Sequence, residues 1–285
     1  MLLLAAVCAG ALIAAPQVYR LTTQLREQPQ YRVRVDEIRL SPPPPHVPRT
    51  TLTDALAEAG LIEAAAGTSL PDAPPESFSL LEPNLAERLH NGLAAQPWIA
   101  EVEEVRIDRS GVQLRLTYRW PALAVATTAG RYLVSGEGVL LPSASAARLD
   151  LDRLPLLLGD RRPPLTAAGL RWRDSEVFAA AGLARALTGT PVSAASQQSL
   201  WEAGEFVSLQ AEGEGWRLNT RGGSHVVWGT AGDVATEPTP DQKARRLADL
   251  LQTRGSLAGH GGPYRIDLTR WDVTTLEPLP AARLR

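Results

Sequence analysis

The chain has 285 residues, 44% of them hydrophobic, and its 29 basic and 31 acidic residues leave a formal net charge of −2. This length allows one large domain or two modest ones, and the charge balance gives no general attraction to nucleic acid or anionic lipid. The single cysteine, Cys8, excludes an internal disulfide and a metal site built from several thiolates.

The chain opens with an unbroken apolar run, residues 1–15. A spanning helix needs about 20 apolar residues, so this run is marginal, and a retained anchor competes with a cleaved signal peptide. Because no basic residue precedes the run, we predict a transmembrane anchor at residues 1–20 and a juxtamembrane linker at residues 21–30. Arg20 and Arg26 would then lie outside, against the positive-inside rule, unless the true start lies upstream.

Residues 31–122 show the order strand, helix, helix, strand, strand. Alternation begins at Tyr31–Val35 and continues to Leu40 after a phase change at Asp36-Glu37, and a proline run follows. Helical patterns with Thr51 and Asn84 as expected N-caps come next. A hairpin closes the region, with strands at 102–107 and 112–118 and a turn at 108–111.

Residues 123–278 are richer in strands, and residues 279–285 form a short tail. A helix is expected over residues 173–187, and a second begins at Pro240 with Thr239 as N-cap and Gln242 three residues on. The expected strands are 131–134, 139–141, 206–211, 216–220, 225–228 and 264–268. The predicted fold class is therefore α+β, with a mostly antiparallel β domain and flanking helices behind the first region.

Several short motifs occur one after another along these predicted elements. The first two are Pro97-Trp98-Ile99 and Arg119-Trp120-Pro121, and Leu154-Pro155 with Gly159 follows. The last are Trp228-Gly229, Lys243 with Leu247, and Tyr264 to Thr269. Together they resemble the FtsQ/DivIB family of bacterial cell division proteins over nearly the whole chain. The sequence departs from that family at the proline run 42–45, where the family has a glycine, and at Tyr118, where it has an acidic residue.

The resemblance implies a POTRA-type domain at residues 31–122, with Pro97, Trp98, Arg119 and Pro121 as its structural signature, and a family-type β domain at residues 123–278. It implies a non-catalytic, single-pass scaffold of the divisome, active in septation, in the bacterial inner membrane with its C-terminal domains outside the cytoplasm. FtsB-like and FtsL-like proteins, other divisome components and the membrane are the implied partners. Cofactors, nucleic acid and small-molecule substrates are not expected.

The predicted partner site is the strand Tyr264–Thr269 together with the helix that begins at Pro240. An edge strand has unpaired N–H and C=O groups to which a partner strand can be added. The residues expected to bind are Tyr264, Arg265, Ile266, Leu268 and Trp271 on the edge, and Lys243, Arg246 and Leu247 on the helix. The alternative is that this strand only completes the fold.

Enzymatic chemistry finds no support in the sequence. The four histidines, His46, His90, His225 and His260, have no metal-ligand spacing and are expected on the surface, and no nucleophile elbow is present. Trp98 and Trp120 are expected in the core and Trp271 on the surface. The alternative function is a POTRA-containing export or outer-membrane assembly factor, which usually carries several POTRA units or a β-barrel pattern, and the sequence shows neither.

Overall fold

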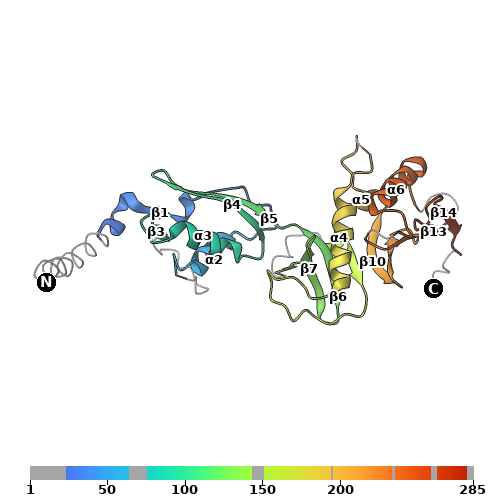
Figure 1. Ribbon diagram of the computed structural model, residues 1–285, viewed down its shortest axis with the longest axis horizontal. Helices are drawn as coiled ribbons and strands as arrows, with labels where there is room; N and C mark the ends of the chain where they lie inside the picture. The colour runs from blue at the N-terminus through green and yellow to red at the C-terminus, as the bar shows by residue number, and fades with distance from the viewer. Residues whose placement is uncertain are drawn as a thin grey trace, which may run out of the picture. The chain divides into compact units, whose positions relative to one another are not determined.

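The computed structural model describes residues 24–63, 76–142, 151–193, 195–232, 235–257 and 262–280. The chain divides into two compact units, Met1–Tyr118 and Arg119–Arg285 (Figure 1). The predicted boundary after residue 122 falls inside strand β6 (Pro121–Thr127), which belongs to the second unit.

The first unit contains a three-stranded sheet with two helices packed against it (Figure 1). The strand order is β2-β5-β4, in which β2 (Arg39–Leu40) runs parallel and β4 (Ile99–Asp108) antiparallel to β5 (Gly111–Tyr118). The helices are α2 (Thr51–Glu58) and α3 (Leu85–Ala94). The order strand, helix, helix, strand, strand that the sequence predicts is therefore present.

The prediction of one continuous strand from Tyr31 to Leu40 is wrong. Its first part, β1 (Arg32–Arg34), pairs with β3 (Ser77–Ser79), which was not predicted, and a 3-10 turn at Val35–Glu37 separates it from β2. The Glu37 carboxylate accepts a hydrogen bond from the Arg34 N–H at 3.1 Å, so the turn is held by its own acidic residues. The chain bends there, and its two halves join different sheets.

The predicted N-cap position of α3 is confirmed, whereas that of α2 is wrong by one residue. Thr50, not Thr51, is the N-cap of α2, and Asn84 holds the N-cap position of α3 in the left-handed region at φ 54° without a side-chain cap bond. Gly92 allows α3 to approach α2, since a Cβ at this position would lie 2.3 Å from the Ala55 carbonyl oxygen.

The second unit is built on one nine-stranded sheet. The order is β14-β13-β12-β11-β10-β9-β6-β7-β8. The remaining strands are β7 (Gly130–Ser135), β8 (Leu140–Leu141), β9 (Leu156–Leu158), β10 (Phe206–Glu212), β11 (Gly215–Thr220), β12 (His225–Gly229), β13 (Tyr264–Asp267) and β14 (Thr275–Pro278). The pairs β6–β9, β9–β10 and β12–β13 are parallel, so the sheet is mixed and the prediction of a mostly antiparallel sheet is corrected.

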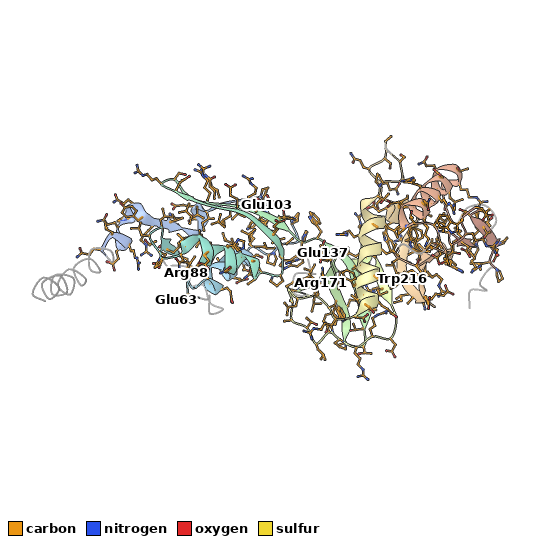
Figure 2. All side chains as sticks on the ribbon, viewed as in Figure 1. Glu63, Arg88, Glu103, Glu137, Arg171 and Trp216 are labelled. Atoms are coloured by element: carbon orange, nitrogen blue, oxygen red, sulfur yellow. The ribbon has the colours of Figure 1, made fainter. Side chains whose placement is uncertain are left out.

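Three helices pack against this sheet: α4 (Ser175–Gly189), α5 (Leu200–Ala203) and α6 (Pro240–Arg254). Their apolar side chains share one core with strand residues such as Leu209, Leu218 and Trp216, the last of which Figure 2 labels. The predicted start of α6 is confirmed, because the Thr239 hydroxyl accepts from the Gln242 N–H while the Gln242 side chain accepts from the Thr239 N–H.

The predicted membrane anchor, residues 1–20, lies outside the described residues, as do parts of the linker 21–30 and the tail 279–285. Within the ranges that the structure describes, no helix combines the length and apolar character needed to cross a bilayer. This finding contradicts the prediction of a single-pass inner-membrane protein, which is withdrawn.

Candidate protein-binding site at a sheet edge

Strand β13 is not the edge strand that the sequence analysis predicted. It pairs in parallel with β12 on one side and antiparallel with β14 on the other. The end of the sheet is β14, whose four residues, Thr275 to Pro278, are too few for an alternating pattern to reveal. The candidate site therefore moves outward by one strand.

The backbone of β14 has one paired side and one outer side. The Leu279 N–H donates to the Pro263 carbonyl at 2.7 Å, which fixes the phase of the antiparallel ladder. By the alternation of such ladders, Thr275 and Glu277 bond toward β13, whereas the N–H and C=O of Leu276 point outward. Pro278, the next outward position, contributes a carbonyl but no N–H. No segment of the described ranges pairs with this outer side.

The opposite end of the sheet is closed. The Leu140 N–H of β8 donates to the Leu170 carbonyl at 2.9 Å, and the Leu140 carbonyl accepts from the Gly169 N–H at 2.8 Å. A third bond joins the Trp172 N–H to the Gly138 carbonyl at 2.9 Å. Proteins cover sheet edges in this way to prevent unwanted strand pairing. The β8 end of this sheet is therefore covered, whereas the β14 end is not.

The β13–β14 pair has one apolar and one charged face. Ile266 lies opposite Leu276, and both pack with the helix-covered core. On the other face Arg265 lies opposite Glu277, and its guanidinium is 3.4 Å from the Glu277 carboxylate and 3.7 Å from that of Asp267. A strand added beside β14 would meet an apolar residue on one face and an acidic residue on the other.

The connection between β13 and β14 is tied to α6 and presents apolar side chains. The Arg246 guanidinium donates to the backbone carbonyls of Arg270 and Trp271. Trp271 is 49% exposed, as expected from the sequence, and Val273 is 45% exposed. Arg246 thus positions the segment that holds two large exposed apolar residues beside the end strand.

Three of the predicted binding residues are core residues instead. Leu247 and Leu268 are fully buried, and Ile266 is 1% exposed. Their side chains pack in the main core of the second unit, so the prediction that they contact a partner is wrong. Tyr264 is half-buried, and the Arg254 guanidinium lies 5.1 Å from the centre of its ring.

Lys243, also predicted to bind a partner, is completely buried. Its ammonium donates to the Glu237 carboxylate at 2.6 Å and to the Thr230 carbonyl at 3.1 Å, and it lies 5.9 Å from the centre of the Trp228 ring. Burial alone would raise the pKa of Glu237, but the hydrogen bonds from Lys243 and Thr230 and the lysine charge outweigh it, and the pKa is lowered. Lys243 therefore fastens the segment between β12 and α6 and does not contact a partner.

The four signature residues of the first region differ in how deeply they are buried. Trp98 is 2% exposed and Pro121 is buried, whereas Pro97 and Arg119 are half-buried. Burial lowers the pKa of Arg119, and the charge of Glu137 partly opposes this.

Two of the expectations for aromatic and histidine side chains are wrong. His46 is not a surface residue: it is 2% exposed and its ring centre lies 5.3 Å from that of Trp98. Trp120, expected in the core, is 62% exposed, because it lies in the connection between β5 and β6, just before the buried strand begins.

In the described part of the chain, no group of three or more His, Cys, Asp or Glu side chains could hold a metal ion. No protein-family model matches the chain, and no curated protein matches it. The likeness to the FtsQ/DivIB family rests on the order of motifs and elements, and it remains a prediction.

Proposed function

We propose that this chain is a non-catalytic binding protein of the bacterial division machinery, which captures an extended segment of an FtsB-like or FtsL-like partner by strand addition to β14. The observation that carries the proposal is the unpaired outer side of β14 at the end of the nine-stranded sheet. Leu276 directs both of its backbone hydrogen-bonding groups to that side, where a partner strand would satisfy them. The kind of partner comes from the motif resemblance.

The surroundings of β14 support the same proposal. Aromatic residues are favoured as anchors in protein interfaces, and Trp271 is exposed beside the edge. The contacts from Arg246 to the carbonyls of Arg270 and Trp271 hold this segment in place before a partner arrives. A pre-positioned anchor reduces the ordering cost of binding.

Two substitutions at Leu276 test the role of the backbone. Leu276→Pro removes the outward N–H without removing a bond to β13, because an edge strand tolerates proline where its N–H faces solvent. We expect this variant to bind the FtsB-like protein of the same bacterium about tenfold more weakly, roughly 1.4 kcal/mol. Leu276→Ala shortens the same side chain but keeps the N–H, so it should retain most of the affinity.

The measurement is titration calorimetry with the purified partner, and circular dichroism checks that each variant is folded. Equal binding by Leu276→Pro and the wild-type chain would rule out strand addition at β14. Equal weakening by the proline and alanine variants would show that the side chain, not the backbone, makes the contact.

A further inference from the structure

A row of polar side chains crosses the second unit's sheet and ends at β14. His225 of β12 lies opposite Arg265 of β13, and Arg265 lies opposite Glu277 of β14. Directly opposite residues share a face of the sheet, and the neighbouring pair, Ile266 and Leu276, packs with the helix-covered core on the other face. Glu277 is therefore the last side chain of the row, and it is exposed at the open edge.

One arginine is shared by two carboxylates at the end of this row. The Arg265 guanidinium lies 3.4 Å from the Glu277 carboxylate and 3.7 Å from that of Asp267. The Asp267 side chain is only 15% exposed and also accepts hydrogen bonds from the N–H and hydroxyl of Thr269, whereas that of Glu277 is 63% exposed. Burial, the largest cause, and two neighbouring arginines lower the pKa of His225, so it adds no full positive charge at pH 7. The row thus ends with one negative charge in excess, and the exposed carboxylate is that of Glu277.

Glu277 also occupies a position where an added side chain comes close. Because the N–H and C=O of Leu276 point outward, Leu276 would form a hydrogen-bonded pair with an antiparallel partner strand, and Glu277 would form the adjacent non-hydrogen-bonded pair. Cα atoms in such a pair are about 4.5 Å apart, against about 5.5 Å in a hydrogen-bonded pair. Opposite charges at directly opposed positions stabilise a sheet, and like charges destabilise it.

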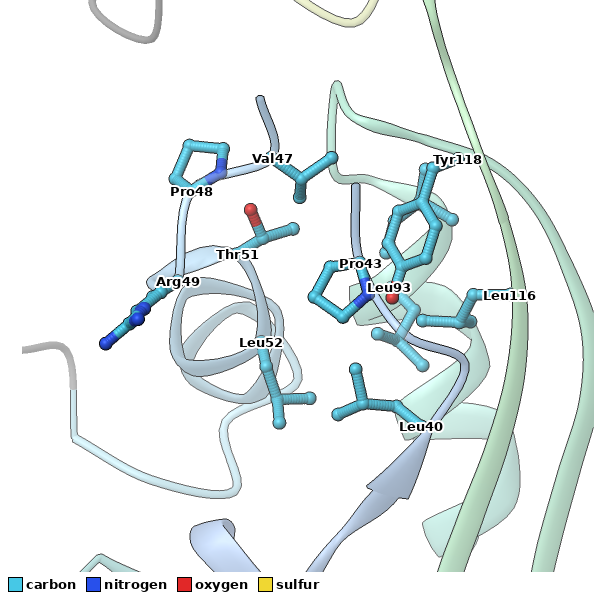
Figure 3. Close-up of a pocket in the computed structure, with 11 residues that line it drawn as sticks. Leu40, Pro43, Val47, Pro48, Arg49, Thr51, Leu52, Leu93, Leu116 and Tyr118 are labelled. Carbon is cyan, nitrogen blue, oxygen red and sulfur yellow. The ribbon is translucent and has the colours of Figure 1, made fainter. Parts of the chain in front are cut away.

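The apolar pocket of the first unit lacks this combination of features. It lies between the proline-rich loop after β2, the start of α2 and the end of β5 (Figure 3). Arg49 is the only charged residue among those that line it, and its guanidinium points away from the hollow (Figure 3). The β14 edge, by contrast, presents backbone groups and an exposed carboxylate together.

We propose, on the basis of strand addition at β14, that the partner segment places an apolar residue opposite Leu276 and a lysine or arginine opposite Glu277. The apolar residue extends the helix-covered core by one strand. The basic residue supplies Glu277 with a second cation on the side away from Arg265. The nearby connection does not change this balance, because the charges of the exposed Arg270 and Asp272 offset each other.

The experiment titrates the full chain with two capped peptides, Thr-Val-Lys-Val-Lys-Val-Thr and Thr-Val-Glu-Val-Glu-Val-Thr, whose alternation fits β14 in either strand direction. The amide NMR signals of Leu276 and Glu277 report binding. At low salt the lysine peptide should bind about fivefold more tightly, as expected of one cross-strand charge pair, and about 0.5 M salt should reduce this ratio. Glu277→Gln should make the two affinities equal, and Glu277→Lys should reverse their order. Glu214→Gln, which removes the same charge from the turn between β10 and β11, should leave the ratio unchanged.

The Leu276→Pro variant separates failure of this inference from failure of strand addition. Equal affinities of the two peptides for the wild-type chain, both weakened by Leu276→Pro, would overturn the basic partner and leave strand addition intact. An unchanged order in Glu277→Lys, or loss of the ratio in Glu214→Gln, would likewise overturn the role of Glu277. Absence of amide shifts at Leu276 with either peptide would contradict strand addition itself, and the basic partner with it.

Discussion

Replacing Lys243 by methionine should destabilise the second unit by about 3 kcal/mol. The methionine keeps the apolar stem of a side chain that has no exposed surface, but it leaves the Glu237 carboxylate, 19% exposed, without its cation. Removing one member of a buried ion pair costs roughly 3–5 kcal/mol. The lower end applies here, because the Thr230 N–H and hydroxyl still donate to Glu237 at 3.0 and 3.1 Å.

Urea unfolding at pH 7, followed by tryptophan fluorescence, measures this loss directly. For a domain of this size about 3 kcal/mol corresponds to a fall in melting temperature of roughly 6–12 °C. The double variant Lys243→Met/Glu237→Gln is the control, and its loss should be well below the sum of the two single losses. A loss under about 1 kcal/mol, or additive losses, would refute the assignment of a coupled buried pair.

The same pair gives the stability a defined pH dependence. The folded-state pKa of Glu237 lies below its usual value of 4.5, so the carboxylate contributes stability above that pH and loses it as the pH falls through the folded pKa. Wild-type stability should therefore decline below about pH 4.5, and Lys243→Met should show a shallower decline in that window. Parallel curves for the two proteins would argue against a lysine-dependent pKa.

Three further outcomes follow from local geometry. Gly229→Ala should lower the free energy of unfolding in urea by at least about 2 kcal/mol, because φ of Gly229 is 73° and a Cβ would lie 2.3 Å from a Glu237 carboxylate oxygen. An unchanged free energy of unfolding would contradict this close contact. Thr239→Ala removes the side-chain cap of α6 and should lower the free energy of unfolding by about 1 kcal/mol in the same assay, whereas Thr239→Ser should leave it nearly unchanged. Burial and the Arg217 charge lower the pKa of His225, so Arg217→Gln should raise it in an NMR titration, and an unchanged value would exclude the arginine as a cause.

The sequence predicted the elements whose signals are local. Thr239, Pro240 and Gln242 specify the start of α6 within four residues, and the turn at 108–111 specifies the β4–β5 hairpin because Gly111 accepts φ 121°. The alternation in β5 also identified its buried face, with Val112, Leu114 and Leu116 all inside.

Features that depend on distant segments could not be predicted in this way. Whether Tyr264–Asp267 is an edge strand depends on Thr275–Pro278, which carries almost no pattern of its own. The sequence predicted Lys243 as a partner-binding residue, but the ammonium is buried, and the Glu237 carboxylate and the Thr230 carbonyl beside it make that burial tolerable. His46 is buried for a similar reason, since the Trp98 ring beside it comes from the connection between α3 and β4, about fifty residues further along the chain.

Strand β9 has only three residues, yet it is the sole strand that joins β6, β7 and β8 to the other five strands of the described sheet. Its parallel pairing with β10 places Leu156–Leu158 opposite Ser208–Gln210. To form this pairing, the chain must close a loop of about fifty residues, and such long-range contacts form slowly during folding. Leu157 is completely buried at this junction. The amide protons of β9 should therefore exchange with solvent only when the whole second unit unfolds, whereas those of β14 should exchange through fraying of the sheet end.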